Sequence, residues 1–266
     1  MKKAFKTLIA LVSISFLIGC SGNRYNSTNV EDYRFETTDS GVKIIELIDK
    51  TAETAYIPTY VTSIGEYAFF HCSSLKSIVI PDSVTSIGEY AFSYCTSLES
   101  ITIPDSVTSI ADRAFFNCCS LTSIVIPDSV TSIGEYAFSY CTSLESITIP
   151  DSVTSIGDYA FYDCSSLIST TIGNAVISIG ASAFSSCSSL ASINIPDSVT
   201  SIADRAFFNC SSLKSIVIPD SVALIGEYAF FGCFSLTIYC VAASKPDGWS
   251  QSWNSMVREV VWGYKG

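Results

Sequence analysis

The chain has 266 residues and a formal net charge of −11, with 48% hydrophobic and only 15% charged residues. A surface that binds nucleic acid through its phosphates needs clustered lysine and arginine, and the repetitive middle of this chain offers only Lys76, Arg113, Arg205 and Lys214. The composition therefore argues against a nucleic-acid partner and against electrostatic adhesion to anionic lipid.

An export signal is predicted over residues 1–19. Lys2, Lys3 and Lys6 precede an apolar run from Leu8 to Ile18, which is too short for a comfortable membrane span. The run ends in Leu17-Ile18-Gly19-Cys20, which resembles the bacterial lipobox. That resemblance implies cleavage before Cys20 and lipid on its thiol and amino group; the alternative is an ordinary signal peptide. Cleavage would remove three lysines and leave a charge of −14.

Residues 20–30 then read as the lipidated cysteine followed by a flexible tether, because they are polar and lack apolar periodicity. Ser21, with no aspartate beside the anchor, resembles lipoproteins sent onward to an outer membrane. In residues 31–56, Tyr33 to Thr38 and Val42 to Leu47 flank the turn residues Asp39-Ser40-Gly41, which predicts a β-hairpin. We expect this hairpin to cover the open end of the repeats that follow.

Residues 57–240 consist of eight consecutive copies of a 23-residue repeat, here called coils 1 to 8. A fixed period of this size predicts stacked units whose core runs from coil to coil. Every copy contains Ala-Phe, then a cysteine three residues later and a leucine three residues after that. These positions are predicted to face inward. The coils begin at Ile57, Ile80, Ile103, Ile126, Ile149, Ile172, Ile195 and Ile218.

Each coil is predicted to contain one short strand and one short helical segment. The pattern Leu-x-x-Ile-x-Ile, as in Leu75-Ile78-Ile80, alternates like a half-buried strand, and proline ends it in most coils. Ser86-Ile87-Gly88-Glu89 has the spacing of a helix capping box. The equivalent serines are Ser63, Ser109, Ser132, Ser155 and Ser201.

The spacing resembles the leucine-rich repeat, and the motif Ile-Gly-x-x-Ala-Phe-x-x-Cys-x-x-Leu-x-x-Ile-x-Ile-Pro resembles the BspA-like class of bacterial surface proteins. The expected fold is an α/β repeat solenoid, a right-handed coil with parallel strands. The resemblance extends into residues 241–266, predicted to be a C-terminal cap. Trp249, Trp253 and Trp262 lie there. We interpret them as a seal over the last coil, with an aromatic platform for sugar as the alternative.

The side chains between the inward residues of each strand are predicted to form an exposed binding strip. A flat strip of small side chains suits broad contact with a protein or a glycan chain and offers no deep pocket. The candidate binding residues are Lys76, Val79, Glu99, Thr102, Thr122, Val125, Glu145, Thr148, Ile168, Thr171, Asn194, Lys214 and Val217.

Eight of the eleven cysteines occupy one column. Neighbouring side chains in such a ladder point the same way, whereas a disulfide needs Cβ atoms turned toward each other. We therefore expect buried free thiols, with disulfides as the alternative. Zinc is disfavoured because no Cys-x-x-Cys pair exists and the adjacent pair Cys118-Cys119 has the wrong spacing.

The sequence predicts neither catalysis nor a cofactor. His71 is the single histidine, and its seven equivalents differ in residue type, which we interpret as a free surface site. The two acidic columns, such as Asp82 after proline and Glu89 before the Ala-Phe pair, are explained by turns and caps. Calcium binding along the stacked aspartates is a minor alternative.

Two functions are left open by these patterns. The resemblance implies a lipid-anchored adhesin that binds an extracellular-matrix or other surface protein, or a polysaccharide, and touches the membrane only through its lipid. The alternative is an envelope scaffold that binds no external ligand.

Coil 6 departs from the others at Gly173-Asn174 and Ala181, and the preceding strand has Thr170 where isoleucine is expected. We expect looser packing or changed curvature at coils 5 and 6.

Overall fold

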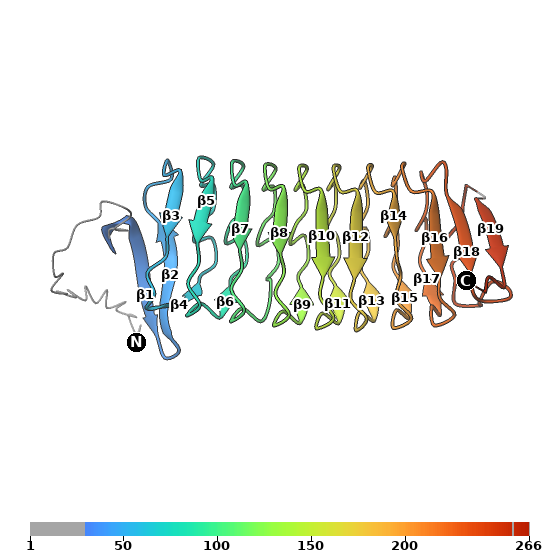
Figure 1. Ribbon diagram of the computed structural model, residues 1–266, viewed down its shortest axis with the longest axis horizontal. Helices are drawn as coiled ribbons and strands as arrows, with labels where there is room; N and C mark the ends of the chain where they lie inside the picture. The colour runs from blue at the N-terminus through green and yellow to red at the C-terminus, as the bar shows by residue number, and fades with distance from the viewer. Residues whose placement is uncertain (1–29, 257, 266) are drawn as a thin grey trace, which may run out of the picture.

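The computed structural model describes residues 30–256 and 258–265. The predicted signal segment, Cys20 and most of the tether lie outside the described residues. The chain winds into one elongated parallel solenoid, with a hairpin at the N-terminal end and β19 at the C-terminal end (Figure 1). This is the repeat solenoid that the 23-residue period predicts.

One long sheet of ten strands runs the length of the solenoid, and neighbours along the chain pair in parallel. It has two strands more than the eight coils supply, because β3 precedes the first coil and β19 follows the last. Its strands are β3 (Thr54–Tyr56), β5 (Ser77–Val79), β7 (Ser100–Thr102), β8 (Ser123–Val125), β10 (Ser146–Ile149), β12 (Ser169–Ile172), β14 (Ser192–Ile193), β16 (Ser215–Ile218), β18 (Thr237–Cys240) and β19 (Glu259–Trp262).

A second row of shorter strands stacks beside the first. It begins with a 3-10 turn, Val30–Asp32, and an antiparallel hairpin of β1 and β2, whose second strand pairs in parallel with β4. Single bridges through Ile110 join its two sheets. The first sheet contains β1 (Tyr33–Thr38), β2 (Gly41–Leu47), β4 (Val61–Ile64) and β6 (Ser86–Ile87). The second contains β9 (Ser132–Ile133), β11 (Ser155–Ile156), β13 (Ser178–Ile179), β15 (Ser201–Ile202) and β17 (Leu224–Ile225).

Identical residues face each other from coil to coil. Ser100 pairs with Ser123, and Ile101 with Ile124, so the register shift equals the repeat length. Because the side chains of a strand alternate between faces, one inward isoleucine in a coil places its equivalents inward in every other coil. The sequence period therefore becomes a set of straight side-chain columns.

The predicted helical segment in each coil is wrong. The N–H groups of Tyr67, Phe69 and His71 donate to carbonyls of the next coil at 2.7–3.0 Å. The intervening N–H groups make three-residue turns, such as Phe70 to the Tyr67 carbonyl at 3.0 Å. Tyr67 and His71 have φ values of 58° and 57°. Left-handed residues at this spacing cannot propagate a right-handed helix, and the chain instead forms a stack of turns.

The capping-box interpretation is wrong for the same reason. Ser86 is not a helix cap because it lies in β6, where it pairs with Ser63 of β4. The serine of each Pro-Asp-Ser-Val turn satisfies another backbone group instead. The hydroxyl of Ser83 donates to the Val61 carbonyl at 2.6 Å, and Ser129 does the same to Val107. Polar side chains thus connect successive coils.

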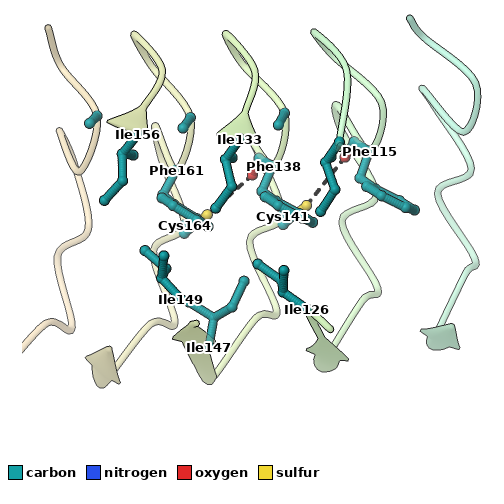
Figure 2. Close-up of a cluster of buried hydrophobic side chains, with 14 of the residues drawn as sticks. Phe115, Ile126, Ile133, Phe138, Cys141, Ile147, Ile149, Ile156, Phe161 and Cys164 are labelled. Atoms are coloured by element: carbon teal, nitrogen blue, oxygen red, sulfur yellow. Dashed lines mark hydrogen bonds between the residues drawn. The ribbon is translucent and has the colours of Figure 1, made fainter. Parts of the chain in front are cut away.

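The core consists of the predicted columns of phenylalanine, cysteine, leucine and isoleucine (Figure 2). The eight repeated phenylalanines are at most 1% exposed, and their rings stack with centroids 5.0–5.6 Å apart. Cys141 and Cys164 donate their thiol hydrogens to the carbonyls of Phe115 and Phe138 at 3.3 and 3.2 Å (Figure 2). Burial raises the pKa of the Cys141 thiol to about 12. Seven of the eight column cysteines, from Cys95 to Cys233, donate a thiol hydrogen bond that joins one coil to the previous one.

Tryptophans seal the C-terminal end, as the sequence predicts. Trp253 packs its edge on Phe230, the last ring of the core column, at 6.1 Å. Trp249 contacts Trp253 at 4.8 Å and donates its indole N–H to the Val222 carbonyl at 3.0 Å. Both rings are buried, so their faces are not a sugar platform.

Coil 6 does not show the looser packing that its altered residues predict. Strands β10 and β12 pair over four residues, up to Ile149 with Ile172. The hydroxyl of Thr170, buried where isoleucine is expected, donates to the Ile147 carbonyl at 3.1 Å. Gly173 allows a close approach, since a Cβ there would lie 2.3 Å from the Pro150 oxygen. Register and core burial therefore continue through this coil.

Candidate functional site

The outward face of the ten-stranded sheet forms the exposed strip that alternation predicts. The burial pattern of β5, β7 and β8 is exposed, buried, exposed. Twelve of the thirteen predicted binding residues are exposed; the exception is Val217, half-buried opposite Tyr239 on the next strand. Tyr239 in turn contacts Tyr264 at 4.9 Å. Aromatic side chains therefore lie at the C-terminal end of the strip.

The strip combines small polar side chains with isolated aliphatic ones. Val79, Val125 and Ile168 are 56%, 73% and 54% exposed, among rows of serine and threonine. Solvent exposure of single apolar residues is ordinary. Val79 and Val125 occupy the same outward column two coils apart, and Ile168 lies in another outward column, so a partner meets them at regular positions on one sheet.

Charge is sparse on this strip: four of the thirteen candidate residues are charged, namely Lys76, Glu99, Glu145 and Lys214. Lys76 forms an ion pair with Glu53, with Nζ 2.9 Å from the carboxylate. The hydrogen bond to Glu53 raises the pKa of Lys76. Both side chains are at least half exposed, so the pair is worth little to folding. The ion pair neutralises the charge of Lys76 and leaves this end of the strip weakly polar.

A second exposed feature lies at the turns and was missed by the sequence analysis. The residue before each Ala-Phe pair, always at positive φ, forms a column that we call the outer ladder. Tyr67 stacks on Tyr90 at 4.7 Å, and Arg113 lies between two tyrosine rings at 5.3 and 4.5 Å. The outer ladder consists of Tyr67, Tyr90, Arg113, Tyr136, Tyr159, Ser182, Arg205 and Tyr228.

A zigzag row of rings runs beside the outer ladder. Its aromatic residue alternates between two neighbouring columns in coils 1 to 5, as Phe70, Tyr94, Phe116, Tyr140 and Tyr162, with centroids 5.4–5.7 Å apart. The imidazole of His71 stacks on the Tyr94 ring at 4.5 Å. From the sequence, the column of His71 and its equivalents is interpreted as a free surface site. Residue variation within that single column hides a pattern that repeats every two coils. That longer period was the available signal.

Some side chains of the acidic columns bind the backbone of the next coil. The carboxylates of Asp112, Asp158 and Asp204 accept the N–H of the equivalent residue one coil on, at 2.6–2.8 Å. Within the described part of the chain, no group of three or more His, Cys, Asp or Glu residues is arranged to hold a metal ion. Calcium along these columns therefore has no structural support there.

Two shallow hollows border the turns of coils 5 to 8. One, of about 570 Å³, is lined by Asp158, Ala181, Asp204, Leu224 and Glu227 among others. The second, of about 430 Å³, is lined by polar residues and by the exposed ring of Phe234. Burial raises the pKa of Asp163 in the second hollow. Its other lining residues are Ser186, Ser188, Asn209, Ser211 and Gly232.

Parallel coils, a continuous ladder of core leucines and one exposed sheet define a protein of the leucine-rich repeat class. This class presents extended surfaces and is generally not enzymatic. Within residues 30–256 and 258–265, no helix has the length and apolar character needed to cross a membrane.

The sequence matches the BspA type leucine rich repeat region over residues 49–119 and 108–237, more than half of the chain. The chain belongs to this family. It is similar to a leucine-rich repeat protein of Bacteroides ovatus, with 31% identity, coverage of 90% of this chain and 71% of the other, and a TM-score of 0.70. It is also similar to the leucine-rich repeat protein of T. pallidum, with 26% identity, coverage of 90% and 100%, and a TM-score of 0.66. No curated protein matches the chain.

Proposed function

We propose that this protein is a bacterial surface adhesin that binds another protein through the outward face of its ten-stranded sheet. The observation that carries the proposal is the exposure of the predicted strip on a sheet of fixed register. A rigid surface loses little conformational freedom on binding, and that lowers the cost of association. The expected partner is an extracellular-matrix or other surface protein, with a polysaccharide as the alternative.

The chemistry of the strip favours broad contact with a large partner. Its exposed aliphatic side chains, such as Val125 and Ile168, are separated by serine and threonine hydroxyls. Apolar contacts surrounded by polar ones are the usual composition of a protein interface. Affinity would come from many small contacts along the sheet and not from one deep pocket.

Two charged residues placed on the strip test this function. Val125→Asp combined with Ile168→Asp should remove most binding to whichever matrix or surface protein the purified parent chain retains. Ile177→Asp combined with Leu224→Asp is the matched control, because Ile177 and Leu224 are 52% and 54% exposed but lie along the other row of strands. Equal loss in both double variants would contradict binding through the ten-stranded sheet.

We further propose a lipid anchor at Cys20, supported by the lipobox resemblance in residues 17–20. Labelling of expressing cells with a tritiated fatty acid should mark the parent chain and leave Cys20→Ala unlabelled. Brief proteolysis of intact cells then separates an adhesin from the alternative of an envelope scaffold. A surface adhesin is degraded, whereas a scaffold inside the envelope survives and the adhesin proposal fails.

A further inference from the structure

The second hollow, of about 430 Å³, lies at the turns of coils 5 to 8, and we call it the polar hollow. Its floor is one column of the repeat, in which every residue has a positive φ. In coils 1, 2 and 4 this column holds the rings of His71, Tyr94 and Tyr140. In coils 5 to 8 it holds Asp163, Ser186, Asn209 and Gly232. The polar hollow therefore results from smaller side chains on the same backbone conformation.

Phe234 in coil 8 gives the polar hollow an apolar wall. Its ring is 62% exposed and lines the hollow. The Arg258 guanidinium lies over this ring, with its central carbon 5.4 Å from the ring centroid, and donates to the Phe234 carbonyl at 3.2 Å. The arginine thus supports the ring from one side and leaves much of it open to solvent. An exposed ring beside a few polar groups is the usual composition of a small-ligand site.

Two polar side chains of the floor are not used by the fold. In the described part of the chain, neither the Asp163 carboxylate nor the Asn209 carboxamide has a hydrogen-bond or ion-pair partner. By contrast, the carboxylate of Asp158 accepts the Ala181 N–H at 2.6 Å. Asp163 is half-buried, and burial raises its pKa. A carboxylate that has lost part of its hydration is stabilised by hydrogen bonds that a ligand donates to it.

The serine rim of the hollow accepts hydrogen bonds more readily than it donates them. The hydroxyls of Ser188 and Ser211 donate to the carbonyls of Ser165 and Ser188 at 3.3 Å. Because a hydroxyl has one hydrogen and two lone pairs, both serines keep only acceptor capacity for a ligand. Together with the Asp163 carboxylate they make the hollow rich in acceptors. A matching ligand therefore carries several O–H or N–H donors and no negative charge.

The dimensions of the hollow set the length of that ligand. Its volume of about 430 Å³ falls within the range of small-molecule sites, about 300–1,000 Å³. Asp163 and Phe234 lie three coils apart, and at about 4.8 Å per coil this separates them by about 14 Å. A ligand that contacts both is longer than one sugar ring. The hollow is also shallow and open along the coils, so it accommodates part of a longer chain.

We propose that the polar hollow binds two or three linked units of a neutral saccharide chain. Sugar hydroxyls would donate to Asp163 and the serine rim, the Asn209 carboxamide would bond a further hydroxyl, and the C–H face of one sugar would pack on Phe234. A lysine side chain matches less well, because Arg258 already places a positive charge against the Phe234 ring. This site does not rest on the proposed adhesive function, since it lies at the turns and not on the ten-stranded sheet.

Titration of the intact protein, followed by calorimetry and NMR, tests the site. The probes are the neutral trisaccharides maltotriose, cellotriose and triacetylchitotriose, with acetylated, amidated Lys-Ala-Lys as the basic comparison. At least one trisaccharide should bind and shift the signals of the Asn209 carboxamide and of the Ser188 and Ser211 amides. Absence of binding by every trisaccharide would overturn the proposal. A shift of these signals by Lys-Ala-Lys alone would assign the hollow to a basic peptide and would overturn it too.

Variants locate the binding. Phe234→Ala should weaken trisaccharide affinity by about threefold or more, whereas Tyr67→Ala, which removes an exposed ring in coil 1, should leave it unchanged. Asn209→Gly should weaken affinity by about five- to tenfold, at a column that already holds Gly232. Asn117→Gly, the equivalent change in coil 3, is its matched control. Phe234→Ala alters only an exposed side chain and keeps the test valid should Asn209→Gly fold poorly. Undiminished binding by both Phe234→Ala and Asn209→Gly would exclude the hollow.

The variants of the sheet distinguish this site from the proposed adhesive surface. Val125→Asp with Ile168→Asp should leave trisaccharide binding unchanged, and Phe234→Ala should leave adhesion to a protein unchanged. Loss of trisaccharide binding in the double variant would place the sugar on the ten-stranded sheet and refute the site in the polar hollow, whatever becomes of adhesion.

Discussion

Two aromatic columns run along this solenoid with nearly the same geometry and very different residue conservation among the coils. In the inner column eight phenylalanines stack at 5.0–5.6 Å and are at most 1% exposed. In the outer ladder, pairs such as Tyr67 and Tyr90 stack at 4.7 Å but are open to solvent on one edge. The inner column never varies, whereas the outer ladder includes tyrosine, arginine and serine.

The difference shows that burial and not stacking constrains the residue type. Loss of a buried ring costs its transfer free energy and also leaves a cavity that a rigid stack cannot close. Loss of a half-exposed ring costs the stacking contact and little more. Coil 6 shows both rules at once, because it retains Phe184 and has lost the ladder ring at Ser182.

The largest expected effect comes from removing an inner ring. Phe138→Ala should lower the free energy of unfolding by about 3–5 kcal/mol, measured by urea denaturation followed by far-UV circular dichroism. Tyr136→Ala, two residues earlier in the outer ladder, is the matched control and should cost about 1 kcal/mol through lost stacking and cation–π contact. Equal losses in the two variants would remove the distinction between the columns.

Restoring the repeat consensus at one position of coil 6 should destabilise the protein. Gly173→Pro matches most other coils, but a Cβ at this position would lie 2.3 Å from the Pro150 carbonyl oxygen. Overpacking of a tight site costs about 1–3 kcal/mol, so the midpoint of urea denaturation should fall. Asn174→Asp, the neighbouring consensus change at an exposed site, is the control and should have little effect. A stabilised Gly173→Pro variant would show that coil 6 is a decayed copy without its own packing.

Alkaline pH should lower the free energy of unfolding through the buried thiols of the inner core. Burial raises the pKa of Cys141 from its ordinary 9.0 to about 12, so the folded chain holds this proton more tightly than the unfolded chain. The stability from this thiol is complete below pH 9 and is lost as the pH rises toward 12, at about 1.4 kcal/mol per pH unit. Urea titrations at pH 8, 9.5 and 10.5 measure the slope. Cys141→Ala should have a shallower slope, and an identical slope would contradict a buried neutral thiol at this position.

The smallest expected effect is a gain. Ser182→Tyr should raise the free energy of unfolding by about 0.5–1.5 kcal/mol, because the new ring stacks on Tyr159 at a backbone conformation that other coils already give to tyrosine. The control Thr154→Tyr adds the same side chain at an exposed position just before β11 and should be nearly neutral. A lower denaturation midpoint for Ser182→Tyr would show that coil 6 cannot accommodate a ring beside Tyr159.

Much of this arrangement could be predicted from the columns alone. Leu75, Ile78 and Ile80 are buried as their alternation predicts, and the residues between them are exposed. The helical segment could not be excluded from the sequence, because serine with an acid three residues on is typical both of a helix cap and of this turn. What decides between a helix and a turn is the partner of the Tyr67 N–H. This group donates to the Glu89 carbonyl in the next coil and not to a carbonyl within its own coil.

The zigzag row of rings was hidden for a related reason. Comparing residues at one column treats a change from Tyr94 to Asn117 as freedom, while Phe116 in the neighbouring column supplies the missing ring. Only spatial adjacency shows that the two columns form one aromatic row. The extra strand β19 is equally invisible to the repeat, because Glu259 to Trp262 carry no copy of the motif and pair with β18 through the backbone.

By itself the sequence determined the period, the inward columns and the exposed strip, because a repeated spacing places equivalent side chains on equivalent faces of every coil. The tertiary structure alone decided how the turns are built, where the stack ends and which exposed rings stack on one another. Those features depend on hydrogen bonds and ring contacts between coils, and such contacts join residues that are 20 or more positions apart in the chain.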